Sequence, residues 1–151
     1  YFVAEWITIS IPKLYGFWAF KKDTNDTRES AAIYVAEYLI EDGAEIHVYD
    51  PKVSEAKIKA DLRYVWDLKG VSEEKIIQKL TQVTVYTDPM KGVYNAHAVA
   101  VLTEWDEFTT YDWKTIYENM YKPAFVFDGR NILDAAMMKK IGFHFKGIGK
   151  G

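Results

Sequence analysis

The chain alternates between short runs of hydrophobic residues and longer stretches in which hydrophobic residues recur every three or four positions. The short runs predict β-strands over 46–49, 83–86, 96–102 and 124–127, with a first strand running to residues 16–17 and a last one near 142–148. The longer stretches predict a helix that ends at Gly43, two helices within 54–80, one around 113–120 and a short one near 133–140. Strands that alternate with helices are typical of a Rossmann-like, doubly wound α/β fold with a mainly parallel sheet.

This alternation runs through the whole chain, which we interpret as a single domain. The 151 residues, of which 49% are hydrophobic, are enough for one well-packed core, and no repeat or linker interrupts them. The first residues lack an initiator methionine and open in the middle of a pattern. We therefore expect residue 1 to be a fragment boundary.

Charge and cysteine content narrow the classes of function. The formal net charge of -3 argues against a general nucleic-acid binder, which needs an excess of clustered lysine and arginine. The absence of cysteine excludes a disulfide framework, a thiolate metal site and a cysteine nucleophile within this chain. No signal peptide and no apolar run of about 18 residues can be recognised, so we expect no membrane partner and a cytoplasmic location.

The segment between the first strand and the first helix carries a candidate anion site. Residues 20–30 read FKKDTNDTRES and contain Lys21, Lys22 and Arg28. A helix N-terminus offers free N–H groups and the positive end of its dipole, and lysines add charge, so a phosphate is the natural ligand. The alternative is a solvated loop in which Asp26 or Thr27 caps the helix.

A second candidate follows the strand predicted over 124–127. Gly129 allows a sharp turn after this strand, and Arg130 is then presented at the carboxyl edge of the sheet. Arginine suits paired hydrogen bonds to a phosphate or to sugar hydroxyls. The alternative is a structural pair between Arg130 and Asp128 or another nearby acid.

Other polar residues favour structural roles. Asp50 ends a strand, as the ribose-binding acid of Rossmann domains does, but the glycine fingerprint is missing and Asp50-Pro51 is better interpreted as a turn. The acids of 103–108 could contact ligand hydroxyls, although helix capping by Asp106 is the favoured interpretation. The histidines show no metal-site spacing, and His97 is expected to be a core or strand-edge residue.

Several blocks closely resemble the UDP-glucose 6-dehydrogenases of the UDP-glucose/GDP-mannose dehydrogenase family. The block FKKDTNDTRES at 20–30 is similar to the family's FKKDTGDTRES. The blocks LTEWDEF at 102–108 and KPAFVFDGR at 122–130 follow in the family's order. The resemblance covers most of residues 16–150 and implies the C-terminal, UDP-sugar-binding domain. The domain is taken to span 1–151, with residues 1–15 as an atypical N-terminal segment.

The resemblance implies a function in the NAD-dependent oxidation of UDP-glucose to UDP-glucuronate. It implies that Phe20, Lys21 and Arg130 bind the substrate, UDP-glucose or UDP, and that Arg28 reaches towards NAD. It also implies two further partners, the NAD-binding and dimerisation domains of the parent enzyme.

Two features that the family's enzymes use for catalysis are missing from this chain. The family's catalytic cysteine has no counterpart, and the glycine fingerprint for NAD is missing. We therefore expect no catalytic residue, no metal site, no turnover and no tight NAD binding in this chain alone. An alternative is a non-catalytic structural or interaction domain of the same fold, in which Trp18, inserted relative to the family, has changed the ligand loop. A second alternative is an NAD-binding module that uses Asp50.

Overall fold

Six parallel strands form one sheet in the computed structural model, which describes residues 13–16 and 31–147. The strands are β1 (Lys13–Gly16), β2 (Glu45–Val48), β3 (Val83–Val85), β4 (Ala98–Val101), β5 (Phe125–Asp128) and β6 (His144–Gly147). Their order across the sheet is β3-β2-β1-β4-β5-β6, and every neighbouring pair is parallel. This order is that of a doubly wound Rossmann-type sheet, which confirms the predicted fold class.

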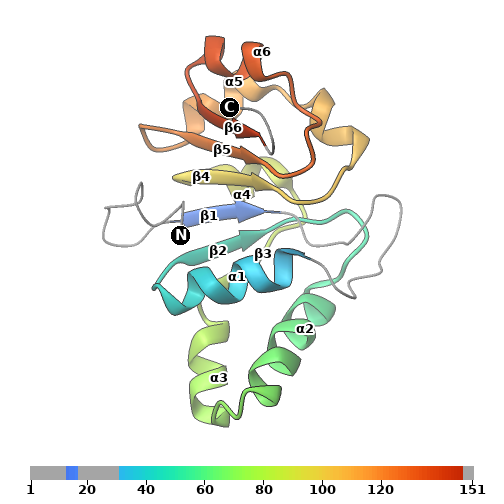
Figure 1. Cartoon of the computed structure of the whole chain (residues 1–151), viewed down its shortest axis with the longest axis vertical. Coiled ribbons are helices and arrows are strands. Elements are labelled where there is room, and N and C mark those ends of the chain that lie inside the picture. The colour runs from blue at the N-terminus through green and yellow to red at the C-terminus, as the bar shows by residue number, and fades with distance from the viewer. Residues whose placement is uncertain (1–12, 17–30, 148–151) are drawn as a thin grey trace.

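Helices connect the strands on both faces of this sheet. They are α1 (Ala31–Glu41), α2 (Glu55–Leu68), α3 (Glu73–Leu80), α4 (Pro89–Val93), the 3₁₀ helix η1 (Asp106–Thr110), α5 (Trp113–Asn119) and α6 (Ala135–Ile141). In the view of Figure 1, α1 lies in front of the sheet and α4 behind it. Across the described residues, no helix combines the length and the hydrophobicity that a bilayer crossing requires.

The core lies between the sheet and these helices. All four residues of β4 are buried, as expected for a central strand that is covered on both faces. On α2, the fully buried residues Ile58, Leu62 and Trp66 recur every four positions and form one apolar stripe. This apolar stripe is the face of α2 that packs into the core.

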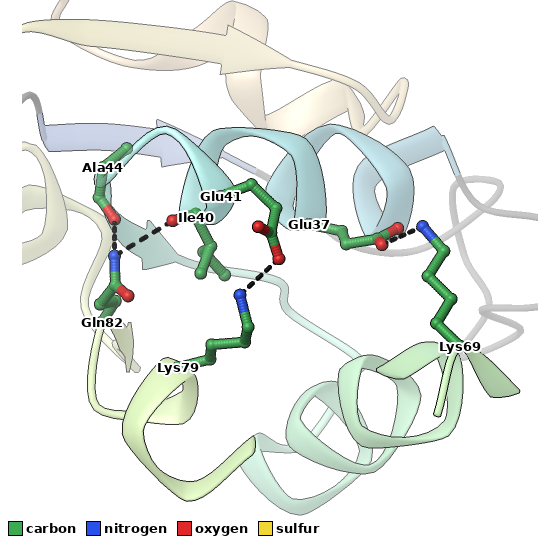
Figure 2. A network of polar contacts seen from close by, with 7 residues as sticks. All are labelled: Glu37, Ile40, Glu41, Ala44, Lys69, Lys79 and Gln82. Atoms are coloured by element: carbon green, nitrogen blue, oxygen red, sulfur yellow. Dashed lines mark hydrogen bonds and ion pairs between the residues drawn. The ribbon is translucent and has the colours of Figure 1, made fainter. Parts of the chain in front are cut away.

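Polar contacts fix α1 against the α2–α3 hairpin (Figure 2). Lys69, just after α2, pairs with Glu37 of α1, and Lys79 of α3 pairs with Glu41. The Gln82 amide donates to the Ala44 carbonyl at 2.9 Å, which ties the segment before β3 to the start of β2. Because the Glu37 side chain is only 9% exposed, its pairing with Lys69 compensates a charge that has lost most of its water.

The structure differs from the predicted elements in a few places. Neither α4 nor η1 was predicted, because each is only five residues long and too short to show a helical period. The strand predicted over 96–102 is confined to 98–101. On α3, Ile76 is fully buried, whereas Ile77 is 55% exposed, since adjacent helical residues point about 100° apart.

A candidate ligand-binding edge of the sheet

The carboxyl ends of β1, β4 and β5 lie side by side at one edge of the sheet. Gly16 ends β1, Val101 ends β4 and Asp128 ends β5, and the pairing β1–β4–β5 makes them neighbours. The strand order reverses between β1 and β4, since β2 and β3 lie on one side and β5 and β6 on the other. In open parallel sheets, such a switch point is where ligands bind.

Arg130 is held at this edge by a turn that Asp128 organises. The Asp128 side chain is buried, and its two oxygens accept the backbone N–H of Arg130 at 3.0 Å and of Leu133 at 2.8 Å. The N–H of Gly129 donates to the Val101 carbonyl at 2.9 Å, which fixes the turn to the end of β4. The backbone at Arg130 is therefore positioned by three hydrogen bonds around a buried carboxylate.

The guanidinium of Arg130 meets a carboxylate from the neighbouring loop. Its Nη2 lies 3.5 Å from Oε1 of Glu104, and the two side chains are 33% and 44% exposed. This pair is one form of the predicted structural alternative, in which Arg130 pairs with Asp128 or another nearby acid; the acid is Glu104, while Asp128 accepts the backbone N–H of Arg130 and not its guanidinium. An arginine side chain that is partly exposed and meets a single carboxylate oxygen retains N–H donors that can be presented to an anionic ligand.

The segment after β4 alternates between buried and accessible residues. Thr103 is fully buried and Trp105 is 5% exposed, so Glu104 between them points towards solvent. Within the described residues, the buried indole N–H of Trp105 has no hydrogen-bond partner. The prediction that Asp106 caps a helix was wrong, because η1 begins at Asp106 and its N-cap is Trp105, without a side-chain cap hydrogen bond.

A second carboxylate at this edge belongs to Glu107, one of the acids of 103–108 that the sequence offered as contacts to ligand hydroxyls. Oε2 of Glu107 accepts the hydroxyl of Tyr49 at 3.2 Å and that of Tyr111 at 2.6 Å. Burial raises the pKa of Tyr49, and the charge of Glu107 raises this pKa further, so the phenol stays protonated. The spacing of Glu107 and Tyr111 at i and i+4 hinted at a contact, but the link to Tyr49 spans 58 residues of sequence.

Asp50 is committed to a turn, as the sequence predicted. Its Oδ1 accepts the backbone N–H of Lys52 at 2.9 Å and of Val53 at 3.1 Å, and the residue is 8% exposed. These are the hydrogen bonds of an Asx-type turn after β2. This commitment weakens the alternative in which Asp50 binds the ribose of NAD.

Three of the four predicted site residues, Phe20, Lys21 and Arg28, lie outside the described residues. Arg130 is therefore the one predicted site residue that the structure places, and it lies at the expected edge of the sheet. His97 is buried just before β4, 4.8 Å from the ring of Tyr121. In residues 13–16 and 31–147, no group of three histidine, aspartate or glutamate side chains could hold a metal ion.

A hollow of about 440 Å³ lies elsewhere, at the turn between α2 and α3, and is lined in part by Lys69, Lys75 and Lys79. Two of these lysines already pair with Glu37 and Glu41 (Figure 2). The hollow thus has little uncompensated positive charge, and it lies at the α2–α3 turn, on the opposite side of the sheet from β5 (Figure 1). We therefore do not assign the anion site to this hollow.

Comparison with known proteins identifies the family of this chain. The model of the UDP-glucose/GDP-mannose dehydrogenase family, UDP binding domain, matches residues 14–135. UDP-glucose 6-dehydrogenase 1 of Arabidopsis thaliana is 48% identical over 144 residues, which cover 91% of this chain and 29% of that protein. UDP-glucose 6-dehydrogenase of Pongo abelii is 47% identical over 139 residues, which cover 91% of this chain and 27% of that protein. The chain therefore spans less than a third of the length of these relatives.

Solved structures share the fold. The NDP-N-acetyl-D-galactosaminuronic acid dehydrogenase of Methanosarcina mazei Go1 superposes with a TM-score of 0.70 at 23% identity, over 92% of this chain and 25% of that one. The UDP-D-ManNAc dehydrogenase of Pyrococcus horikoshii superposes with a TM-score of 0.66 at 25% identity, over 99% of this chain and 28% of that one. Together with the family match over residues 14–135, these relatives confirm the resemblance: the chain belongs to the UDP-glucose/GDP-mannose dehydrogenase family, as its UDP binding domain.

Proposed function

We propose that this chain binds the UDP part of UDP-glucose as the substrate domain of an NAD-dependent UDP-glucose 6-dehydrogenase, which converts UDP-glucose to UDP-glucuronate. The observation that carries the proposal is Arg130, whose backbone is held at the carboxyl edge by the buried Asp128 and whose side chain is 33% exposed. A diphosphate needs donors of this kind, and the switch point beside β1 and β4 is where parallel sheets bind ligands. The relatives named UDP-glucose 6-dehydrogenase favour glucose as the sugar.

Further residues complete the proposed site. Phe20 and Lys21 contact the substrate alongside Arg130, with the charge of Lys21 near the nucleotide sugar. Arg28 reaches towards NAD. We extend the domain over the whole of residues 1–151, with 1–15 as an atypical N-terminal segment, and we place the protein in the cytoplasm.

The residues of this chain do not fit a complete NAD site. The sequence has no glycine fingerprint, and Asp50 is occupied by the turn that follows β2. We therefore assign NAD, the catalytic cysteine and the dimer contacts to other domains of a parent enzyme, and we expect this chain to be inactive by itself.

A thermal-shift titration with UDP, UDP-glucose and NAD tests the proposal. We expect UDP and UDP-glucose to raise the melting temperature, with NAD giving little change; a ligand at about 100 times its Kd adds about 2.7 kcal/mol to the free energy of unfolding. Arg130→Ala and Lys21→Ala should each weaken the UDP response. Arg63→Ala is a matched control, because it removes the same charge from α2, where Arg63 pairs with Glu73.

Two results would contradict the proposal. An unchanged melting temperature with UDP and UDP-glucose would favour the alternative of a non-catalytic structural or interaction domain. Equal UDP responses in wild type, Arg130→Ala and Lys21→Ala would refute the site assignment while leaving nucleotide binding intact.

A further inference from the structure

Glu107 forms a bridge across the carboxyl end of β1. Tyr49 directly follows β2, whereas Glu107 and Tyr111 belong to the segment that follows β4. Because β1 lies between β2 and β4 in the sheet, the contact between Tyr49 and Glu107 spans the end of β1, beside the switch point. The carboxylate is thereby fixed at the same edge as Arg130, but on the β2 side of the sheet.

The two oxygens of the Glu107 carboxylate differ in their hydrogen bonds to the described residues. Both tyrosine hydroxyls donate to Oε2, and within the part of the chain that the structure describes no group donates to Oε1. An ionised carboxylate has about four acceptor positions, so two tyrosine donors leave strong acceptor capacity at a fixed place. The buried Tyr49 adds rigidity to one side of this arrangement.

We propose that Oε1 of Glu107 accepts a hydrogen bond from a ribose hydroxyl, 2′ or 3′, of the bound uridine diphosphate. A carboxylate repels phosphate but suits a hydroxyl donor, so the diphosphate lies towards Arg130 and the ribose towards Glu107. In dinucleotide-binding sheets, the ribose acceptor is an acid at the end of the second strand. Here Asp50, the acid at that position, is used by its turn, and Glu107 is docked on the neighbouring Tyr49.

This inference rests on the proposed function, since it requires UDP at the edge of the sheet. It adds a specificity-determining residue, one that distinguishes a ribonucleotide from its deoxy analogues. The purely structural alternative is that Glu107 only fixes η1 to the end of β2. The two roles differ in one observable, the ratio of affinities for UDP and for a deoxy-UDP.

Calorimetric titration of the whole chain with UDP, 2′-deoxy-UDP and 3′-deoxy-UDP measures this ratio. In wild type, we expect at least one deoxy analogue to bind about 10- to 100-fold more weakly than UDP, the range typical of a hydrogen bond to a charged group. Glu107→Leu removes both oxygens at similar volume and should bring that ratio close to one. Glu107→Gln keeps an acceptor without the charge, so it should reduce the ratio even if the leucine variant does not fold.

Tyr111→Phe is the matched control, because it removes one hydrogen bond of the same cluster and keeps the carboxylate. It should lower stability while leaving most of the ratio in place. UDP binding with equal affinity for both deoxy analogues, or a ratio unchanged in the Glu107 variants, would overturn the inference and leave the proposed function standing. Absence of UDP binding in wild type would overturn both.

Discussion

Replacing Asp128 with alanine removes the buried carboxylate on which the loop after β5 is built. The change deletes both oxygens and leaves the N–H groups of Arg130 and Leu133, now at 3.0 and 2.8 Å from those oxygens, without their acceptor. Asp128 is 1% exposed, so water does not reach these donors unless the loop opens. Each unsatisfied buried donor costs about 1–3 kcal/mol, and we expect Asp128→Ala to lower the free energy of unfolding by about 3 kcal/mol.

Urea unfolding followed by tryptophan fluorescence measures this loss. With a denaturant slope of about 2 kcal/mol per molar, the midpoint should fall by about 1.5 M. Asp134→Ala is a suitable comparison, because Asp134 is an exposed N-cap whose side chain accepts one N–H, that of Met137. Its loss should cost about 1 kcal/mol.

The same variant tests the link between the loop and the ligand. If Asp128 positions Arg130, Asp128→Ala should also weaken UDP binding, whereas Asp134→Ala should not. A loss of stability below about 1 kcal/mol for Asp128→Ala would refute the reasoning about buried donors. A full loss of stability with unchanged UDP affinity would show that the turn does not position the guanidinium.

Three further variants test other parts of the structure. Gly142→Ala should lower the free energy of unfolding, measured in urea, by about 2–3 kcal/mol, because φ is +127° and a Cβ would lie 2.7 Å from the Tyr117 ring. A decrease of less than about 0.5 kcal/mol would be inconsistent with that contact. Lys69→Ala should cost about 1–2 kcal/mol by leaving the mostly buried Glu37 unpaired, and less at high salt; a salt-independent or negligible loss would argue against the pair. Folding raises the pKa of Tyr49, so its contribution to the free energy of unfolding is present below the unfolded pKa of about 10 and is lost as pH rises through the folded pKa. Tyr49→Phe should therefore flatten the fall of the free energy of unfolding above about pH 10. An equally steep fall in the variant would contradict this assignment.

Helices and turns could be predicted from the sequence where the local residue pattern indicates which side chains are buried or which residue makes a turn. The helix that ends before Gly43 was predicted from its apolar spacing, and Gly43 has a φ of +88°, the positive value that glycine tolerates. The turn at Asp50 was predicted from the residue type and position alone. Short elements such as α4 and η1 were missed because five residues cannot display a helical period.

The candidate site was predictable only in part. Gly129 after a buried strand predicted where Arg130 would lie, since the carboxyl end of a parallel strand fixes the edge of the sheet. The partner of Arg130 could not be deduced, because Glu104 comes from the neighbouring strand's loop and depends on the order of β4 and β5. The contact between Tyr49 and Glu107 depends on the same tertiary arrangement, in which two chain segments meet over β1.

The most direct test of nucleotide binding at this edge is an NMR titration of the ¹⁵N-labelled chain with UDP. We expect the amide signals that shift to belong to the carboxyl edge, above all those of Glu104, Gly129 and Arg130, and we expect Arg130→Ala to reduce these shifts at the same UDP concentration. Shifts that concentrate at the hollow around Lys75, or a spectrum that UDP leaves unchanged, would contradict the assignment of the nucleotide site to this edge.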